Sequence, residues 1–232
     1  MMKKTITPVA FALIAISIPI IITTFATESV AFSDTFFLQQ FQKLDLESTS
    51  GFSGPEYLHF SNTLQKYFRL RLPSPQLLIQ TGDKLEPLYR QGEIAHLEDV
   101  QHLFQRELLA RNLSCIMLIA GLGLLVATKQ QRPSTTIAAA IISGCSIGIT
   151  AFLLLLFAVW RNFKQAFTIF HLIAFDNMLW QLDPAQDNLL KLFPEQFFFN
   201  ATTTIAIRVL CPLIILLGGS IWYYKKVGNK SS

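Results

Sequence analysis

Residues 136–160 read TIAAAIISGCSIGITAFLLLLFAVW, a run without a single charged side chain. About 20 consecutive apolar residues are enough for an α-helix to cross the hydrocarbon core of a bilayer, so this run predicts a membrane-spanning helix. Residues 6–26 and 202–224 form two further runs of this length. We interpret the first of these as a retained anchor, because its apolar stretch is longer than that of an ordinary secretory signal peptide.

A fourth apolar run covers residues 113–127 and is short for a span. Leu108, Leu109 and the apolar stem of Arg111 extend it, because an arginine near a helix end can place its charge among the headgroups. Over the whole chain, 51% of the residues are hydrophobic and only 15% are charged. About a quarter are charged in a typical soluble domain, so these values exclude a disordered tail and argue against a soluble enzyme.

Charge predicts the orientation of the four spans. All 15 acidic residues and all four histidines fall within residues 27–112 and 161–201. The remaining loop and the two termini carry only cations, namely Lys3, Lys4, Lys129, Arg132, Lys225, Lys226 and Lys230. By the positive-inside rule both termini are cytoplasmic. The net charge of +4 is then an orientation signal, and no nucleic-acid partner is expected.

The predicted fold class is an all-α integral membrane protein with four transmembrane helices and a mostly helical extracellular cap. The predicted segments are a first transmembrane helix at 1–27, an extracellular cap at 28–107, a second transmembrane helix at 108–128, a cytoplasmic loop at 129–135, a third transmembrane helix at 136–160, an extracellular aromatic-rich segment at 161–201, a fourth transmembrane helix at 202–224 and a cytoplasmic tail at 225–232. Cys115, Cys145 and Cys211 all fall inside spans, which argues against a disulfide framework or a cysteine zinc site.

Helix signals recur in the first outer segment. Ser33 is expected to cap one short helix, and the capping box at Ser53 starts another that ends near Leu70. A third helix is expected to begin at Gln91 or Gly92 and to run into the second span.

The second outer segment is rich in aromatic residues. Trp160, Phe163, Phe167 and His171 recur at helical spacing, so we expect one stripe that prolongs the third span. A turn at Asp183 is expected to precede a short helix near Asp187.

Glu93, His96 and Asp99 form the strongest polar constellation. On a helix these residues share one face, where a carboxylate can orient the imidazole; the alternative is a solvated face with incidental pairs. His171 is expected among phenylalanines, where desolvation keeps the imidazole neutral and able to accept a proton. Arg208, two turns into the fourth span, is expected to reach a lipid phosphate or to pair with Asp176 or Asp187.

The order of these motifs resembles the lipoprotein intramolecular transacylase family. The matching stretches are GEIAHLEDV at 92–100, the pair FH at 170–171, the segment from Trp180 to Asp187, and LFPEQFF at 192–198. The resemblance implies an acyltransferase that moves the sn-2 acyl chain of a diacylated lipoprotein to the amine of its N-terminal cysteine. It also implies that His96 and His171 are the catalytic residues, at the junction of cap and membrane.

A histidine suits this chemistry, because its pKa near 6.5 allows it to take a proton from an amine at neutral pH. His96 is the preferred base, since Asp99 can stabilise its imidazolium. Glu93, Asp176 and Asp187 are expected to support the pair. The expected substrate-binding residues are Phe167, Phe170, Phe175, Trp180 and Arg208. We expect no cofactor and no metal, a monomer in contact with membrane lipid, and an active site at the outer face of a bacterial cytoplasmic membrane.

Two other functions remain open at this level. A metal-dependent lipid hydrolase would use His96, Asp99 and His171 as ligands. A non-enzymatic membrane subunit would use the outer segments to bind lipid or protein.

Overall fold

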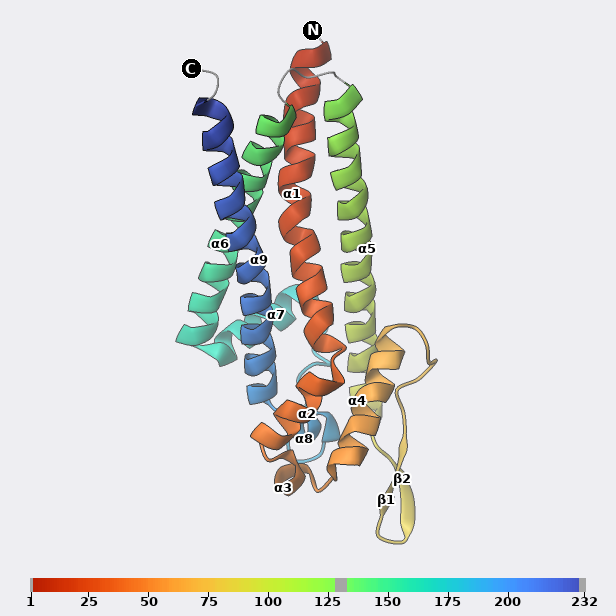
Figure 1. Ribbon diagram of the computed structural model, residues 1–232. Coiled ribbons are helices and arrows are strands. Elements are labelled where there is room, and N and C mark those ends of the chain that lie inside the picture. The colour runs from red at the N-terminus through yellow and green to blue at the C-terminus, as the bar shows by residue number, and fades with distance from the viewer. Residues whose placement is uncertain (1, 128–132, 230–232) are drawn as a thin grey trace. The chain divides into compact units, whose positions relative to one another are not determined.

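The computed structural model describes residues 2–127 and 133–229 (Figure 1). The cations Lys129, Arg132 and Lys230 lie outside the described residues, as do the side chains of Lys3 and Lys4. In chain order the elements are α1 (Met2–Ala31), α2 (Asp34–Lys43), α3 (Leu46–Ser50), α4 (Gly54–Phe68), β1 (Leu78–Thr81), β2 (Lys84–Pro87), α5 (Gln91–Ala127), α6 (Pro133–Arg161), α7 (Phe163–Ala174), α8 (Asn188–Leu192) and α9 (Glu195–Asn229).

Four of these helices, α1, α5, α6 and α9, are long and apolar enough to cross a membrane, which confirms the predicted fold class. The longest is α5, with 37 residues. At 1.5 Å per residue it measures about 55 Å, whereas the hydrocarbon core is about 30 Å thick. Its first turns are therefore not needed to span the membrane.

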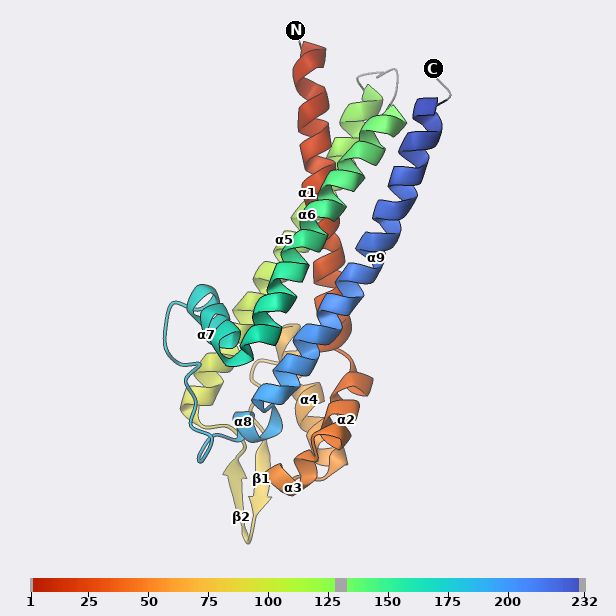
Figure 2. The same ribbon diagram turned by 90° about the vertical axis from the view of Figure 1, so that its left-hand side faces the viewer.

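The chain divides into two compact units. The first consists of residues 1–27, 108–157 and 204–232, and contains the apolar parts of the four long helices. Figures 1 and 2 show that the first turn of α1 and the last turn of α9 lie at the same end of this unit as the end of α5 and the start of α6. The two described termini therefore lie on one side of this unit, as an even number of spans requires.

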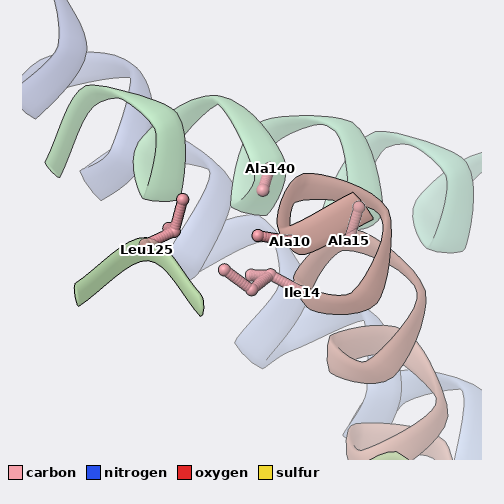
Figure 3. Packing of buried hydrophobic residues seen from close by; sticks show 5 residues of the cluster. All are labelled: Ala10, Ile14, Ala15, Leu125 and Ala140. Atoms are coloured by element: carbon pink, nitrogen blue, oxygen red, sulfur yellow. The ribbon is translucent and has the colours of Figure 1, made fainter. Parts of the chain in front are cut away.

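Small residues let the helices of this first unit approach closely. Figure 3 shows Ala10, Ile14 and Ala15 of α1 packed with Leu125 of α5 and Ala140 of α6. Gly144 of α6 lies directly against the backbone of Ala15, where a Cβ atom would overlap the carbonyl group. A second cluster joins Ala26, Cys145, Val209 and Leu213 and so includes α9. Close backbone approach at small residues is typical of helix packing in membranes.

The second unit consists of residues 28–107 and 158–203 and has an aromatic core. The Ser33 side chain accepts from Phe36 N at the start of α2, and Ser53 with Glu56 forms the predicted capping box of α4. The inner faces of these helices meet the end of α8 and the first turn of α9 in one cluster of rings, which comprises Phe36, Phe37, Phe41, Tyr57, Phe193 and Phe197. Stacked and edge-to-face aromatic pairs of this kind stabilise the unit beyond simple area burial.

Two local features differ from the sequence expectation. Strands β1 and β2 form an antiparallel hairpin between α4 and α5, where no element was predicted. Gly82, at φ +61°, makes its tight turn. The third span does not continue as one stripe to His171. It ends at Arg161, and extended Asn162 caps the separate helix α7 by accepting from Gln165 N.

Candidate functional site

The two histidines singled out in the sequence lie together in the second unit. His96 is in the second turn of α5 and His171 is near the end of α7, and their ring centroids are 6.1 Å apart. Only 7% of His96 and 6% of His171 are exposed. The structure thus brings together two imidazoles from distant parts of the sequence and encloses them.

Glu93 holds the first turn of α5, one turn before His96. Its side chain is fully buried; Oε2 accepts from the Arg90 N–H at 2.7 Å, and Oε1 accepts from the Leu189 N–H at 2.6 Å. The first bond closes the helix start like a capping box, and the second ties it to α8. Burial raises the pKa of Glu93 above its ordinary value, although both backbone bonds oppose this. Glu93 therefore fixes the backbone at the start of α5, one turn before His96, and its role as a support for the two histidines stays a prediction.

We expect Glu93→Gln to destabilise the start of α5 and its connection to α8. A glutamine has one acceptor oxygen in place of two, so either the Arg90 or the Leu189 N–H is left buried without a partner, at a cost of about 1–3 kcal/mol. Thermal unfolding in detergent measures this loss. Glu98→Gln, at an exposed position of the same helix, is the control. If the two variants unfold at the same temperature, Glu93 has no such role.

Aromatic rings surround His171. Phe167 lies 4.2 Å from the imidazole centroid, Trp180 4.8 Å, Phe170 5.3 Å and Phe175 5.5 Å. Phe175 also lies 5.3 Å from the ring of His96, so it contacts both histidines. These four aromatic residues are among the five that the sequence suggested for substrate binding. The imidazoles therefore lie in an apolar, water-poor environment.

The hydrogen-bond partner of His171 determines which of its two ring nitrogens carries the hydrogen. Nδ1 lies 2.7 Å from the carbonyl oxygen of Phe167, one turn earlier in α7. A carbonyl oxygen can only accept, so Nδ1 carries the hydrogen, and in the neutral ring Nε2 has the free lone pair. His171 is thus held in the tautomer that presents Nε2 as a proton acceptor.

His96 lacks this kind of support. Among the described residues, its buried Nδ1 has no hydrogen-bond partner. The Asp99 carboxylate, which we expected to orient this imidazole, instead accepts from Nδ2 of Asn177 at 2.8 Å. Asp99 is joined by that bond to the loop after α7, and it acts on His96 only through its charge. The sequence reasoning did not identify Asn177.

Burial keeps both imidazoles neutral. Desolvation and the neighbouring His171 lower the pKa of His96 to about 4, against the opposing charge of Asp99. Desolvation also lowers the pKa of His171, although its bond to Phe167 opposes this. Two buried imidazoles at this distance resist becoming cationic together, so at most one of them is expected to be positively charged at a time.

The other predicted residues are placed differently. Asp187 pairs with Arg90 at 3.4 Å and accepts from the Asp183 N–H at 2.6 Å, so it holds the turn that precedes α8. Asp176 is exposed. Arg208 is exposed on α9 in the first unit, and its role in substrate binding stays a prediction. Within residues 2–127 and 133–229, no group of three or more His, Cys, Asp or Glu side chains is arranged to hold a metal ion.

The model of the lipoprotein intramolecular transacylase family, Lit, matches residues 12–198, a range that contains both histidines. The chain belongs to this family. It is therefore a multi-pass membrane protein and an acyltransferase. No curated protein matches the chain.

Solved structures of one family member share the fold. The in meso structure of the membrane-integral lipoprotein intramolecular transacylase Lit from Bacillus cereus is similar over 100% of this chain and 99% of that chain, with 20% identity and a TM-score of 0.73. Two further structures of that protein, in which one histidine is replaced by arginine or by alanine, match over 100% of this chain and 95–96% of theirs, with 19% identity and a TM-score of 0.71.

Proposed function

We propose that this Lit-family protein moves the sn-2 acyl chain of a diacylglyceryl lipoprotein to the α-amine of its N-terminal cysteine and releases a lyso-form lipoprotein. The observation that carries the proposal is the pair of buried imidazoles 6.1 Å apart, one of them with Nε2 free to accept a proton. An ester becomes an amide in this reaction, so it is downhill and needs no nucleotide. Both reactants belong to one molecule, and holding them in contact supplies much of the rate.

His171 is the base in our proposal, in place of His96. The amine nitrogen attacks the ester carbonyl carbon while His171 Nε2 takes the amine proton. The carbon–oxygen bond to glycerol then breaks, and the same proton passes from the imidazolium to the departing glyceryl oxygen. The Phe167 carbonyl stabilises the imidazolium through Nδ1, much as a carboxylate does in a catalytic triad. One carbon–nitrogen bond forms, one carbon–oxygen bond breaks, and no net proton is consumed.

His96 acts as a hydrogen-bond donor to the tetrahedral oxyanion. Its lowered pKa keeps it neutral while His171 is cationic, and a neutral imidazole N–H can stabilise an oxyanion in a site without water. The surrounding rings exclude water, which would otherwise compete with the amine for the acyl group.

We place the site at the outer face of the bacterial cytoplasmic membrane, with both termini in the cytoplasm. The support is the distribution of charge, because the acidic residues and the histidines all fall in the segments that the positive-inside rule assigns to the outer side. The described ends of α1 and α9 on one side of the first unit agree with this arrangement. We further propose that the protein works as a monomer in contact with membrane lipid.

Mass spectrometry of a reporter lipoprotein tests the function in cells. The N-terminal peptide is isolated from cells with and without this chain. The proposal predicts N-acyl, S-monoacylglyceryl cysteine only when the chain is present. A diacylglyceryl cysteine that stays unchanged in both strains would contradict it.

The pH dependence of kcat/KM tests the state of the imidazoles. The substrate amine has an ordinary pKa of about 8, so log(kcat/KM) should fall with a slope of one below about pH 8. The pKa values of both histidines are lowered, and that of His96 is about 4. The line should therefore stay straight through pH 6.5, since a lowered pKa leaves the imidazoles neutral there. A second break between pH 6 and 7 would mean that the base titrates as an ordinary histidine.

A further inference from the structure

Asn177 is the centre of the loop that follows α7. Its Nδ2 donates to Oδ2 of Asp99 at 2.8 Å, its Oδ1 accepts from the Leu179 N–H at 2.9 Å, and its backbone oxygen accepts from the indole N–H of Trp180 at 3.1 Å. One residue thus connects α5, the turn of the loop and the Trp180 ring.

The loop is held at its two ends, by the ring contacts of Phe175 with the histidines and by the pair of Asp187 with Arg90, and is irregular between them. It has no helix or strand between the end of α7 and the start of α8, and both residues after Asn177 are exposed, Met178 by 59% and Leu179 by 42%. Hydrophobic burial therefore contributes little at this turn. A bond from an amide to a charged carboxylate is stronger than one between neutral groups, so the contact with Asp99 anchors the loop at Asn177.

The anchor is close to the proposed base. Trp180, which is fixed by Asn177, lies 4.8 Å from His171 with its ring tilted by 36° from the imidazole plane. Asp99 is three residues after His96 on α5, so the anchoring point lies on the same helix as the second histidine. The loop therefore sets the position of Trp180 relative to both imidazoles.

We propose that Asn177 is a positioning residue for acyl transfer, which holds the Trp180 indole over His171 through its hydrogen bond to Asp99. The proposal rests on the transacylase function proposed above. With the indole in place, water is kept from the base and the cysteine amine is the only nucleophile at the ester carbonyl. When the indole leaves, water can attack the same carbonyl, break the carbon–oxygen bond and release a free fatty acid. Asn177 therefore controls the ratio of transfer to hydrolysis.

Asn177→Leu tests this with purified protein and a synthetic diacylated lipopeptide, whose products are separated by mass. We expect kcat for transfer to fall about tenfold with a smaller change in KM, and the share of free fatty acid to rise. Asn200→Leu is the matched control, because it removes another asparagine side-chain bond of the same unit, the one to Gln40. A ratio of transfer to hydrolysis in Asn177→Leu equal to that of the control would overturn the proposal.

An exchange of the two partners tests the hydrogen bond itself. Asn177→Asp places a second carboxylate beside Asp99 and should behave like Asn177→Leu. The double variant D99N/N177D has the donor and the acceptor exchanged, and the carboxylate at position 177 can still accept from Leu179. We expect it to recover most of the transfer ratio. Failure to recover it would show that Asn177 does not act through Asp99.

Fluorescence supplies a test that is independent of activity. In a W160F/W222F background Trp180 is the only tryptophan, and its emission should shift to longer wavelength in N177L as the indole becomes exposed to water. Asp99→Leu, which removes the same bond from the other side, should give the same shift if N177L does not fold. If the folded variants have unchanged Trp180 emission, Asn177 does not position the indole. If the emission shifts as expected in N177L but the parent protein does not transfer acyl chains, only the proposed function is refuted.

Discussion

Replacing His171 by alanine is expected to lower the rate of acyl transfer about a thousandfold at neutral pH. The variant has no group to take the proton from the cysteine amine, and general-base catalysis contributes about 10²–10⁴ in rate. His171→Gln should be no better, because an amide does not accept a proton at this pH. The rate is measured with purified protein and a diacylated lipopeptide.

His102→Ala is the control for His171→Ala. His102 is exposed on α5, and the variant should transfer acyl chains at the rate of the unmodified protein. If His171→Ala keeps more than about a tenth of the activity, another group is the base, and the bond between Nδ1 and Phe167 has no catalytic meaning.

Replacing His96 by alanine is expected to lower the rate about a hundredfold or more, as does the loss of an oxyanion donor in other acyl-transfer enzymes. Here the conservative variant separates the roles. His96→Gln keeps an N–H donor near the oxyanion and should recover part of the rate, whereas His171→Gln should recover none. If glutamine recovers part of the rate at position 171 and none at position 96, then His96 is the base and His171 is the oxyanion donor.

Much of the fold could be predicted because its signals are local. The four apolar runs specify the long helices, and Ser33 and Ser53 mark the starts of α2 and α4 through caps that involve neighbouring residues. The hairpin between Leu78 and Pro87 was missed because its strands have four residues each and prolines nearby. The break at Asn162 was missed because an apolar stripe continues across it.

The site could be predicted in part. The spacing of Glu93 and His96 indicated that they lie one turn apart on the same helix. The aromatic residues near His171 in the sequence indicated that its imidazole is desolvated. The partner of Asp99 could not be inferred, since its contact with Asn177 joins residues 78 positions apart. The bond from His171 to Phe167 ends on a backbone carbonyl, which every residue has, so it leaves no trace in the sequence. These two contacts decided which histidine we assign as the base.

Acyl transfer within a mixture of two lipopeptides tests the central claim most directly. One lipopeptide has deuterated acyl chains and a peptide of different mass, and the other is unlabelled. Both are incubated together with the purified protein. The acyl group on each cysteine amine is then identified by tandem mass spectrometry. The account predicts that each cysteine receives the chain from its own glyceryl group, and that this product disappears in His171→Ala and His96→Ala. Exchange of labelled chains between the two peptides, or transfer that persists in both variants, would contradict it.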